Sequence, residues 1–246
     1  MAENLHPLVL IHGLTFDRST WQPLLDELAR IQPDRRVLAL DLPGHGDAPR
    51  ALSYDLGDVA TYVHDAAAAA HLDAPILVGH SIGAIVALIY AARFPTAAVV
   101  NLDQPLYTKP FSALLHTLRP ELEGPDFQAA WERFRNSMGF DQLDDRMREL
   151  VLSSHRPEQA LVVGYWQGVF DESPDALQAR VDASLRMLAD RQTPFTYVSG
   201  RPVDPEYAEW LTRSVPQVRI ERFERSGHFP QLGDPRRLAE LLATLP

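Results

Sequence analysis

Short apolar runs alternate with helical patterns over roughly the first hundred residues of the chain. The segments at 7–11, 36–40, 75–78 and 97–102 are largely apolar and have the length of strands. The first of them is apolar on both faces, which is typical of a buried strand in a parallel sheet. Between these segments, helical spacing of apolar residues predicts helices at 19–30, 58–72 and 82–93. The alternation predicts a mostly parallel sheet with helices on both of its faces.

The alternation of strand and helix patterns stops after residue 104. Between 104 and 192 no segment has the pattern of a strand, and helices are predicted near 127–138, 143–152, 157–170 and 175–190. Strand patterns return at 195–199 and 218–223, followed by a helical pattern at 234–245. We therefore predict a core domain of residues 1–104 and 193–246, with an all-helical cap of residues 105–192 inserted between two strands. Such a cap covers the C-terminal edge of the sheet, where open α/β sheets bind ligands.

The composition is that of an ordinary globular protein, with 46% hydrophobic and 23% charged residues. A formal net charge of −10 argues against nucleic acid or an anionic membrane as a partner, because binding either requires a basic surface. The chain has no cysteine, which excludes disulfides, thiolate metal sites and a cysteine nucleophile. The first residues lack the basic and apolar regions of a secretory signal, so we expect a cytoplasmic protein.

One uncharged stretch is long enough to span a bilayer. Residues 74–92 contain no Lys, Arg, Asp or Glu. The stretch is interrupted by Pro75, Gly79, Ser81 and Gly83. We therefore interpret it as a buried strand, a turn and a helix rather than as a membrane span.

The sharpest chemical signal lies inside this stretch, in the pentapeptide Gly79-His80-Ser81-Ile82-Gly83. It has the pattern G-x-S-x-G between a predicted strand and a predicted helix, the context in which a tight turn raises a serine hydroxyl above a sheet. The glycines leave room for the turn, and the start of the helix supplies free N–H groups and positive potential. Ser81 is therefore the candidate nucleophile, with an ordinary glycine-rich turn as the alternative.

A neutral serine hydroxyl needs a base within hydrogen-bond reach to act as a nucleophile. Among nine histidines, His228 lies in the loop between the last predicted strand and the last predicted helix. In the chain order Ser, acid, His, the base comes late, so His228 is the candidate. The alternative is a loop histidine satisfied by solvent. His80 adjoins Ser81, but neighbouring side chains diverge on such a turn, and we interpret His80 as structural.

Acyl transfer also requires hydrogen-bond donors for an oxyanion. The N–H of Ile82, directly after the candidate nucleophile, is one candidate donor. The N–H of Leu14, in the turn after the first strand, is the second. His12 and Gly13 are expected to shape this turn, while Thr15 offers either a further donor or a local turn contact.

Four segments together resemble proteins of the α/β-hydrolase fold with a helical cap. They are Val9-Leu10-Ile11-His12-Gly13, Asp41-Leu42-Pro43-Gly44-His45-Gly46, Val78-Gly79-His80-Ser81-Ile82-Gly83 and Gly227-His228-Phe229-Pro230. The resemblance covers nearly the whole chain. It implies a mostly parallel α/β-hydrolase sheet flanked by helices, with Ser81 as nucleophile, His228 as base, and the N–H groups of Leu14 and Ile82 as the oxyanion hole. In one departure, the first strand begins almost at the N-terminus, so the antiparallel strands that usually precede it are missing.

The acid that would orient His228 has two candidate positions in this resemblance. Asp103 follows the strand before the cap directly, at its C-terminal end. Asp204 follows the strand after the cap, one residue later than the common G-x-x-D spacing. Each aspartate also has an alternative, purely local role. Asp103 suits a hydrogen bond to amides of its own loop, and Asp204 suits the N-cap of a helix. Asp103 is favoured, and both remain candidates.

A serine at the nucleophile position argues against haloalkane and epoxide hydrolysis, because the family members that catalyse those reactions place Asp there. The cap is rich in aromatic residues, among them Trp131 and Trp166, which are expected either to line a pocket or to pack between helices. Tyr107 and Phe229, with Leu106, adjoin the predicted catalytic loops and are expected to line the pocket. An apolar lid indicates a substrate with sizeable apolar surface.

The sequence contains no phosphate-binding loop, no dinucleotide fingerprint and no metal-ligand spacing, so we expect neither a cofactor nor a metal. These observations favour a serine hydrolase that cleaves an ester or lactone of a small-to-medium apolar molecule through an acyl-enzyme. The same triad serves C–C bond hydrolases, amidases and perhydrolases, and the fold also carries ligand receptors and lyases. These functions are the alternatives.

Overall fold

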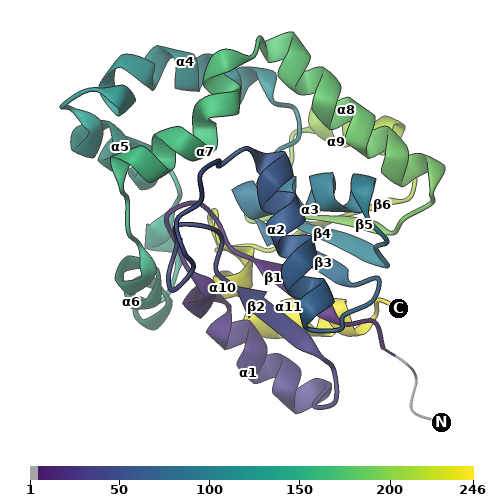
Figure 1. Cartoon of the computed structure of the whole chain (residues 1–246). Helices are drawn as coiled ribbons and strands as arrows, with labels where there is room; N and C mark the ends of the chain where they lie inside the picture. The colour runs from purple at the N-terminus through teal and green to yellow at the C-terminus, as the bar shows by residue number, and fades with distance from the viewer. Residues whose placement is uncertain (1–4) are drawn as a thin grey trace.

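The computed structural model describes residues 5–246 of the chain. Six strands form one sheet in the order β2-β1-β3-β4-β5-β6, and every neighbouring pair is parallel (Figure 1). The strands are β1 (Leu8–Ile11), β2 (Val37–Leu40), β3 (Ile76–His80), β4 (Ala98–Leu102), β5 (Phe195–Ser199) and β6 (Val218–Arg222). Each lies within one or two residues of its predicted position at either end. Within the described residues no strand precedes β1.

The helices of the core surround this sheet. They are η1 (Arg18–Trp21), α1 (Gln22–Ile31), α2 (Leu56–Ala69), α3 (Ile82–Arg93), α9 (Pro205–Ser214), α10 (Pro230–Gly233) and α11 (Pro235–Ala243). Alternate residues of a strand enter different hydrophobic clusters, as the two-residue period of a strand requires. Val9 and Ile11 of β1 pack into the cluster that contains α2 and α3, while Leu8 and Leu10 pack with α1 and α11. The two pairs of helices therefore cover opposite faces of the sheet.

The remaining helices lie between β4 and β5 in the sequence. They are α4 (Lys109–Glu123), α5 (Phe127–Asn136), η2 (Phe140–Gln142), α6 (Asp145–Ser154), α7 (Gln159–Asp171) and α8 (Pro174–Asp190). Although these helices separate β4 from β5 in sequence, the two strands pair directly, with Val99 opposite Phe195. Helices α4, α5, α7 and α8 arch over the sheet in Figure 1, and their side chains share one hydrophobic cluster with α2 and α3.

Helix α4 was not predicted from the sequence. Its two prolines, Pro110 and Pro120, are residues that normally interrupt a helix. Pro110 lies in the first turn, where its missing N–H has no intrahelical partner to lose. Pro120 lies in the last turn, close to the end of the helix at Glu123. The helix therefore tolerates both residues.

The uncharged stretch at 74–92 forms β3, the turn at Ser81 and α3, as expected. Among the described residues, no helix combines the length and the apolarity needed to cross a membrane.

The turn between β3 and α3 is the tightest junction of the core. Ser81 has a φ of 53°, a conformation that L residues rarely adopt, so the fold imposes it. A Cβ on Gly79 would collide with the backbone of Gly83 and Ala84, and a Cβ on Gly83 would collide with the carbonyl oxygen of Ile11. The two glycines of the pentapeptide are therefore required by close backbone packing of α3 against β1 and β3.

We expect Gly83→Ala to lower the free energy of unfolding by about 3 kcal/mol, because the neighbouring backbone carbonyls cannot move aside as a flexible side chain would. The matched control is Gly168→Ala in α7, where an added Cβ meets nothing within 4 Å. The control should be neutral or stabilising by up to about 1 kcal/mol, since alanine favours helix. Urea unfolding followed by circular dichroism measures both, and a Gly83→Ala protein as stable as wild type would contradict the packing described above.

Candidate active site

Ser81 lies at the C-terminal edge of the sheet, at the N-cap position of α3. Its N–H donates to the carbonyl of Leu102 at 3.1 Å, and its own carbonyl accepts from the N–H of Ala84 at 2.8 Å. The turn is thereby tied both to the neighbouring strand and to the helix that follows. Ser81 is only partly buried and lines a cavity of about 560 Å³ beneath the helices inserted between β4 and β5, which we call the cap.

His228 and Asp103 meet beside this cavity. The Nδ1 atom of His228 lies 2.8 Å from Oδ2 of Asp103, across 125 positions of sequence. The other carboxylate oxygen, Oδ1, accepts from the N–H of Gly200 at 2.9 Å and from the hydroxyl of Ser199 at 3.0 Å. Burial by itself would raise the pKa of Asp103, but the hydrogen bonds from His228, Gly200 and Ser199 outweigh it and hold the pKa below its usual value. Asp103 is therefore an ionised acceptor, and Nδ1 of His228 is the donor.

Asp204, the other candidate acid, has a different role in the structure. It is exposed and precedes α9, where its Oδ1 accepts from the N–H groups of Glu206 at 2.9 Å and Tyr207 at 3.1 Å. These are the contacts of a helix N-cap. Asp204 lies at the edge of the same cavity, but the carboxylate that contacts His228 belongs to Asp103.

The two candidate oxyanion donors lie on either side of Ser81. The loop after β1 approaches so closely that a Cβ on Gly13 would stand 3.3 Å from Cβ of Ser81. Within residues 5–246, the N–H groups of Leu14 and Ile82 donate to no protein acceptor. Ile82 also begins α3, where the helix dipole provides positive potential. The arrangement can therefore stabilise negative charge next to the hydroxyl of Ser81.

Two buried histidines hold the loops around Leu14. Nε2 of His45 accepts from the N–H of Thr15 at 3.0 Å, and Nε2 of His12 accepts from the N–H of Leu42 at 2.9 Å. Each can act as an acceptor only while its ring is neutral. Burial lowers the pKa of His12 to about 4 and that of His45 to about 3, so both rings are neutral near pH 7.

His80 supports His228 rather than Ser81. Its Nε2 lies 2.7 Å from the carbonyl oxygen of His228, and its ring is completely enclosed. Burial lowers the pKa of His80 to about 3, so a neutral ring donates its Nε2–H to that carbonyl. The residue before the candidate nucleophile thus fixes the backbone of the candidate base.

Aromatic and aliphatic side chains form most of the cavity wall. Tyr107 lines it, as expected, and so do Trp131 and Trp166, for which the sequence left pocket lining and packing between helices open. The indole N–H of Trp131 donates to Nε2 of His155 at 2.9 Å, which fixes that wall in place. The sequence analysis did not single out several further lining residues: Phe16, Thr108, Tyr197, Arg201 and Tyr207. They lie in loops, in the middle of β5 and at the starts of α4 and α9, which only the tertiary structure brings together.

Phe229 and Leu106 do not line the cavity, in contrast to the expectation from sequence. Both side chains are fully buried. Phe229 packs instead in a separate cluster with Phe16, Met138 and Leu232. Its proximity to His228 in the sequence does not place it in the pocket, because successive side chains of this loop point in different directions.

No group of three or more His, Cys, Asp or Glu side chains within residues 5–246 is arranged to hold a metal ion.

We expect the stability of the protein to fall in mild acid because of its neutral buried histidines. An unfolded histidine titrates near 6.5, so below that pH the unfolded chain binds protons that the folded chain excludes. The free energy of unfolding should decrease with pH by about 1.4 kcal/mol per pH unit for each such histidine. In His45→Gln, the slope between pH 6 and pH 4 should be shallower by that amount. Urea unfolding at several pH values tests this, and parallel profiles for the two proteins would contradict it.

Comparison with known proteins agrees with this architecture. A family model described as "Alpha/beta hydrolase family" matches residues 8–241. The chain is 29% identical over 254 residues to a pimeloyl-(acyl-carrier protein) methyl ester esterase of Neisseria meningitidis serogroup C, an alignment that covers 98% of this chain and 93% of the relative.

Two solved structures illustrate the likeness in fold. An AqdC variant, described in connection with ring-cleavage of the Pseudomonas quinolone signal, superposes with a TM-score of 0.78 at 18% identity, covering 98% of this chain and 92% of that one. A thermophilic esterase from Thermogutta terrifontis superposes with a TM-score of 0.65 at 22% identity, covering 96% and 88%. At these sequence identities, the similarity of the structures shows only that the fold is shared. Because the family model spans almost the whole chain, the protein belongs to the alpha/beta hydrolase family.

Proposed function

We propose that the protein is a serine hydrolase that cleaves a carboxylic ester or lactone with sizeable apolar surface. In this proposal Ser81 is the nucleophile, His228 the general base and Asp103 the acid that orients His228. The observation that carries it is the 2.8 Å contact between His228 and Asp103 at the cavity that Ser81 lines, next to two unpaired N–H groups.

The proposed reaction begins with attack of the Ser81 hydroxyl oxygen on the ester carbonyl carbon. His228 takes the hydroxyl proton on Nε2, and the carbonyl oxygen becomes an oxyanion that accepts from the N–H groups of Leu14 and Ile82. When the C–O bond to the alcohol breaks, the same proton passes from His228 to the departing oxygen. Water then attacks the acyl-enzyme with His228 as base, which releases the acid and restores Ser81.

The surroundings of Asp103 suit its proposed role. Three donors hold its carboxylate in the ionised form, so it can accept from Nδ1–H of His228 and leave Nε2 free as an acceptor. When His228 gains a proton, the imidazolium forms beside a buried negative charge and is stabilised by it. These side chains and N–H groups supply every proton and charge contact in the scheme, so the proposed reaction requires no cofactor.

The cavity and the curated relative both support an ester as substrate. Its volume of about 560 Å³ and its aromatic walls suit a small-to-medium apolar molecule. The Neisseria meningitidis relative is named for cleavage of a methyl ester of a pimeloyl group on an acyl-carrier protein. The preference of this chain among esters depends on its own cap.

We expect the wild-type protein to hydrolyse p-nitrophenyl esters and to react with a fluorophosphonate probe. Ser81→Ala should lose covalent labelling and at least about 10⁴-fold in kcat, because the nucleophile is absent. Absorbance at the p-nitrophenolate band and mass spectrometry of the labelled protein measure the two effects. Labelling that persists in Ser81→Ala, or a wild-type protein inert to both reagents, would refute the proposal. Turnover that survives Ser81→Ala would instead favour a lyase.

The two aspartates provide a second test. We expect Asp103→Asn to lower kcat by about three to four orders of magnitude, because an amide does not stabilise the imidazolium and favours the wrong tautomer of His228. Asp204→Asn should stay within a few-fold of wild type and fold normally, since asparagine caps a helix as well as aspartate. Equal losses of kcat in the two variants would contradict the assignment of Asp103. A loss of kcat confined to Asp204→Asn would assign the acid to Asp204.

A further inference from the structure

A second hollow adjoins the candidate active site between the core and the cap. It has a volume of about 710 Å³ and is bounded by residues 52–56, one face of α3, and helices α7 and α8. We call it the α3 groove. Its lining and that of the catalytic cavity have six residues in common: Leu56, Ile85, Tyr165, Val169, Leu177 and Val181. The two spaces are therefore adjacent and share a wall, most of which is aliphatic.

One face of α3 sets the direction of the groove. The lining residues on this helix are Ile85, Leu88, Ile89, Ala92 and Arg93. Their spacing of three and four positions places them on a single stripe of the helix. Since a helix rises 1.5 Å per residue, the stripe starts about 6 Å from Ser81 and ends about 18 Å from it. The groove thus leads from the nucleophile toward the far end of α3.

This direction points away from His228. The chain continues from His228 into α10 and α11, which pack with α1 on the face of the sheet opposite to α3. In the proposed reaction His228 must protonate the departing alcohol oxygen, so the alcohol part lies on the His228 side of the carbonyl carbon. The acyl part lies on the other side of that carbon, which faces the stripe on α3.

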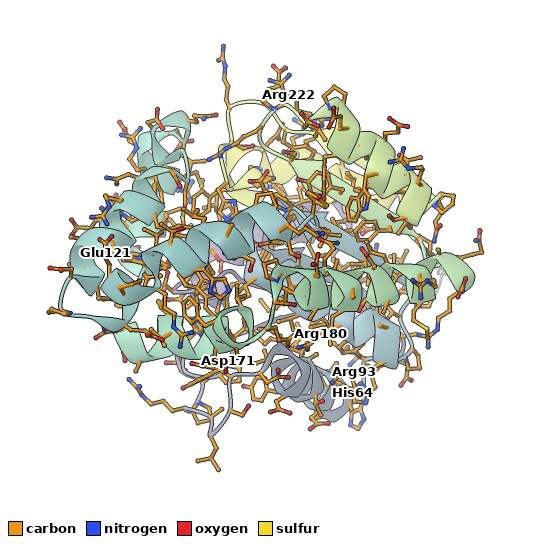
Figure 2. The ribbon with its side chains drawn as sticks, turned by 90° about the horizontal axis from the view of Figure 1, so that it is seen from above. His64, Arg93, Glu121, Asp171, Arg180 and Arg222 are labelled. Carbon is orange, nitrogen blue, oxygen red and sulfur yellow. The ribbon has the colours of Figure 1, made fainter. Side chains whose placement is uncertain are left out.

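The chemistry of the walls suits an alkyl chain. Apolar side chains form the boundary with the catalytic cavity and most of the stripe on α3, and the charged residues Arg93, Asp171 and Arg180 lie on one side of the molecule (Figure 2). Arg180 is paired with Glu172, and Arg93 donates to the carbonyl of Gly57 at 2.9 Å. These cations thus have protein partners, and the lining combines an apolar wall toward the catalytic cavity with polar residues elsewhere.

We propose that the α3 groove binds the acyl chain of the substrate and that the enzyme acts on esters of medium to long unbranched acids. The proposal rests on the proposed function, because the chain is placed relative to Ser81 as nucleophile and His228 as acid. Three bonds of an extended chain span about 3.8 Å, so a path of about 18 Å corresponds to roughly fourteen bonds. Acyl chains of about eight to fourteen carbons therefore reach well into the groove, whereas an acetyl group stays in the catalytic cavity.

The test fills the groove without touching the catalytic cavity. Gly168 in α7 lines the groove but not the catalytic cavity. A Cβ added at this position would meet nothing within 4 Å. Gly168→Trp therefore adds a large side chain to open space. Ala183→Trp adds the same side chain from α8, at an exposed position that lines the groove and not the catalytic cavity. The matched control is Ala160→Trp, at an exposed position of α7 that lines neither space.

The readout is kcat/KM for p-nitrophenyl acetate and p-nitrophenyl decanoate, which share one leaving group. We expect the decanoate-to-acetate ratio to fall at least tenfold in Gly168→Trp and in Ala183→Trp, and to keep its wild-type value in Ala160→Trp. Urea unfolding of each variant accompanies the assay, and a ratio is compared only among proteins that are folded.

Three results would overturn the inference. A wild-type ratio in both groove variants would show that the acyl chain does not enter the groove. A loss confined to decyl acetate, whose long chain is on the alcohol, would assign the groove to the leaving group. A wild-type protein that hydrolyses no ester of any chain length would refute the proposed function itself, and this outcome is distinct from turnover with an unchanged ratio.

Discussion

The candidate active site depends on one strained bend in the backbone. Ser81 is held at positive φ because the chain must leave β3 and enter α3 within a single residue. Only glycine fits at positions 79 and 83, where the helix lies against the carbonyl groups of β1 and the turn. The bend fixes three features together: the direction of the serine hydroxyl, the free N–H of Ile82 beside it, and the axis of α3 beneath the cap.

The neighbouring strand, β4, is also followed by a residue with a positive φ. His80 and Leu102 are register partners in β3 and β4, so Ser81 and Asp103 follow paired residues at one edge of the sheet. Asp103 also has a positive φ, of 54°. The parallel strands β3 and β4 are thus each followed by a strained residue with a polar side chain, Ser81 after β3 and Asp103 after β4. His228 arrives from beyond β6, and its position is fixed by Asp103 on the ring and by His80 on the backbone.

Local patterns predicted the parts of this site that a few consecutive residues determine. The apolar runs and the G-x-S-x-G spacing predicted all six strands, α3 and the position of Ser81 between them. The partner of His228 depends on how strands β4 and β5 align, which spacing alone left open between Asp103 and Asp204. Asp204 also had a strong local use as an N-cap, and the structure shows that use. Local patterns also failed for α4, whose prolines obscured its helical character, and for Phe229, whose burial depends on Phe16 and Met138 far away in the sequence.

In the proposed reaction, the fold also separates the two halves of the ester. The proposed base, His228, reaches the site from the face of the sheet that carries α1 and α11, while the helix after Ser81 runs along the other face. The leaving group, which takes its proton from His228, therefore lies on one side of a carbonyl carbon at Ser81. The stripe of α3 lies on the other side. The loops nearest the candidate site are held by hydrogen bonds between buried neutral histidines and the backbone. The cap helices that line the α3 groove contact the core through apolar side chains. Substitution at Gly168 or Ala183, which line the groove and not the catalytic cavity, can therefore change the size of the proposed acyl site without adding a group to the catalytic cavity.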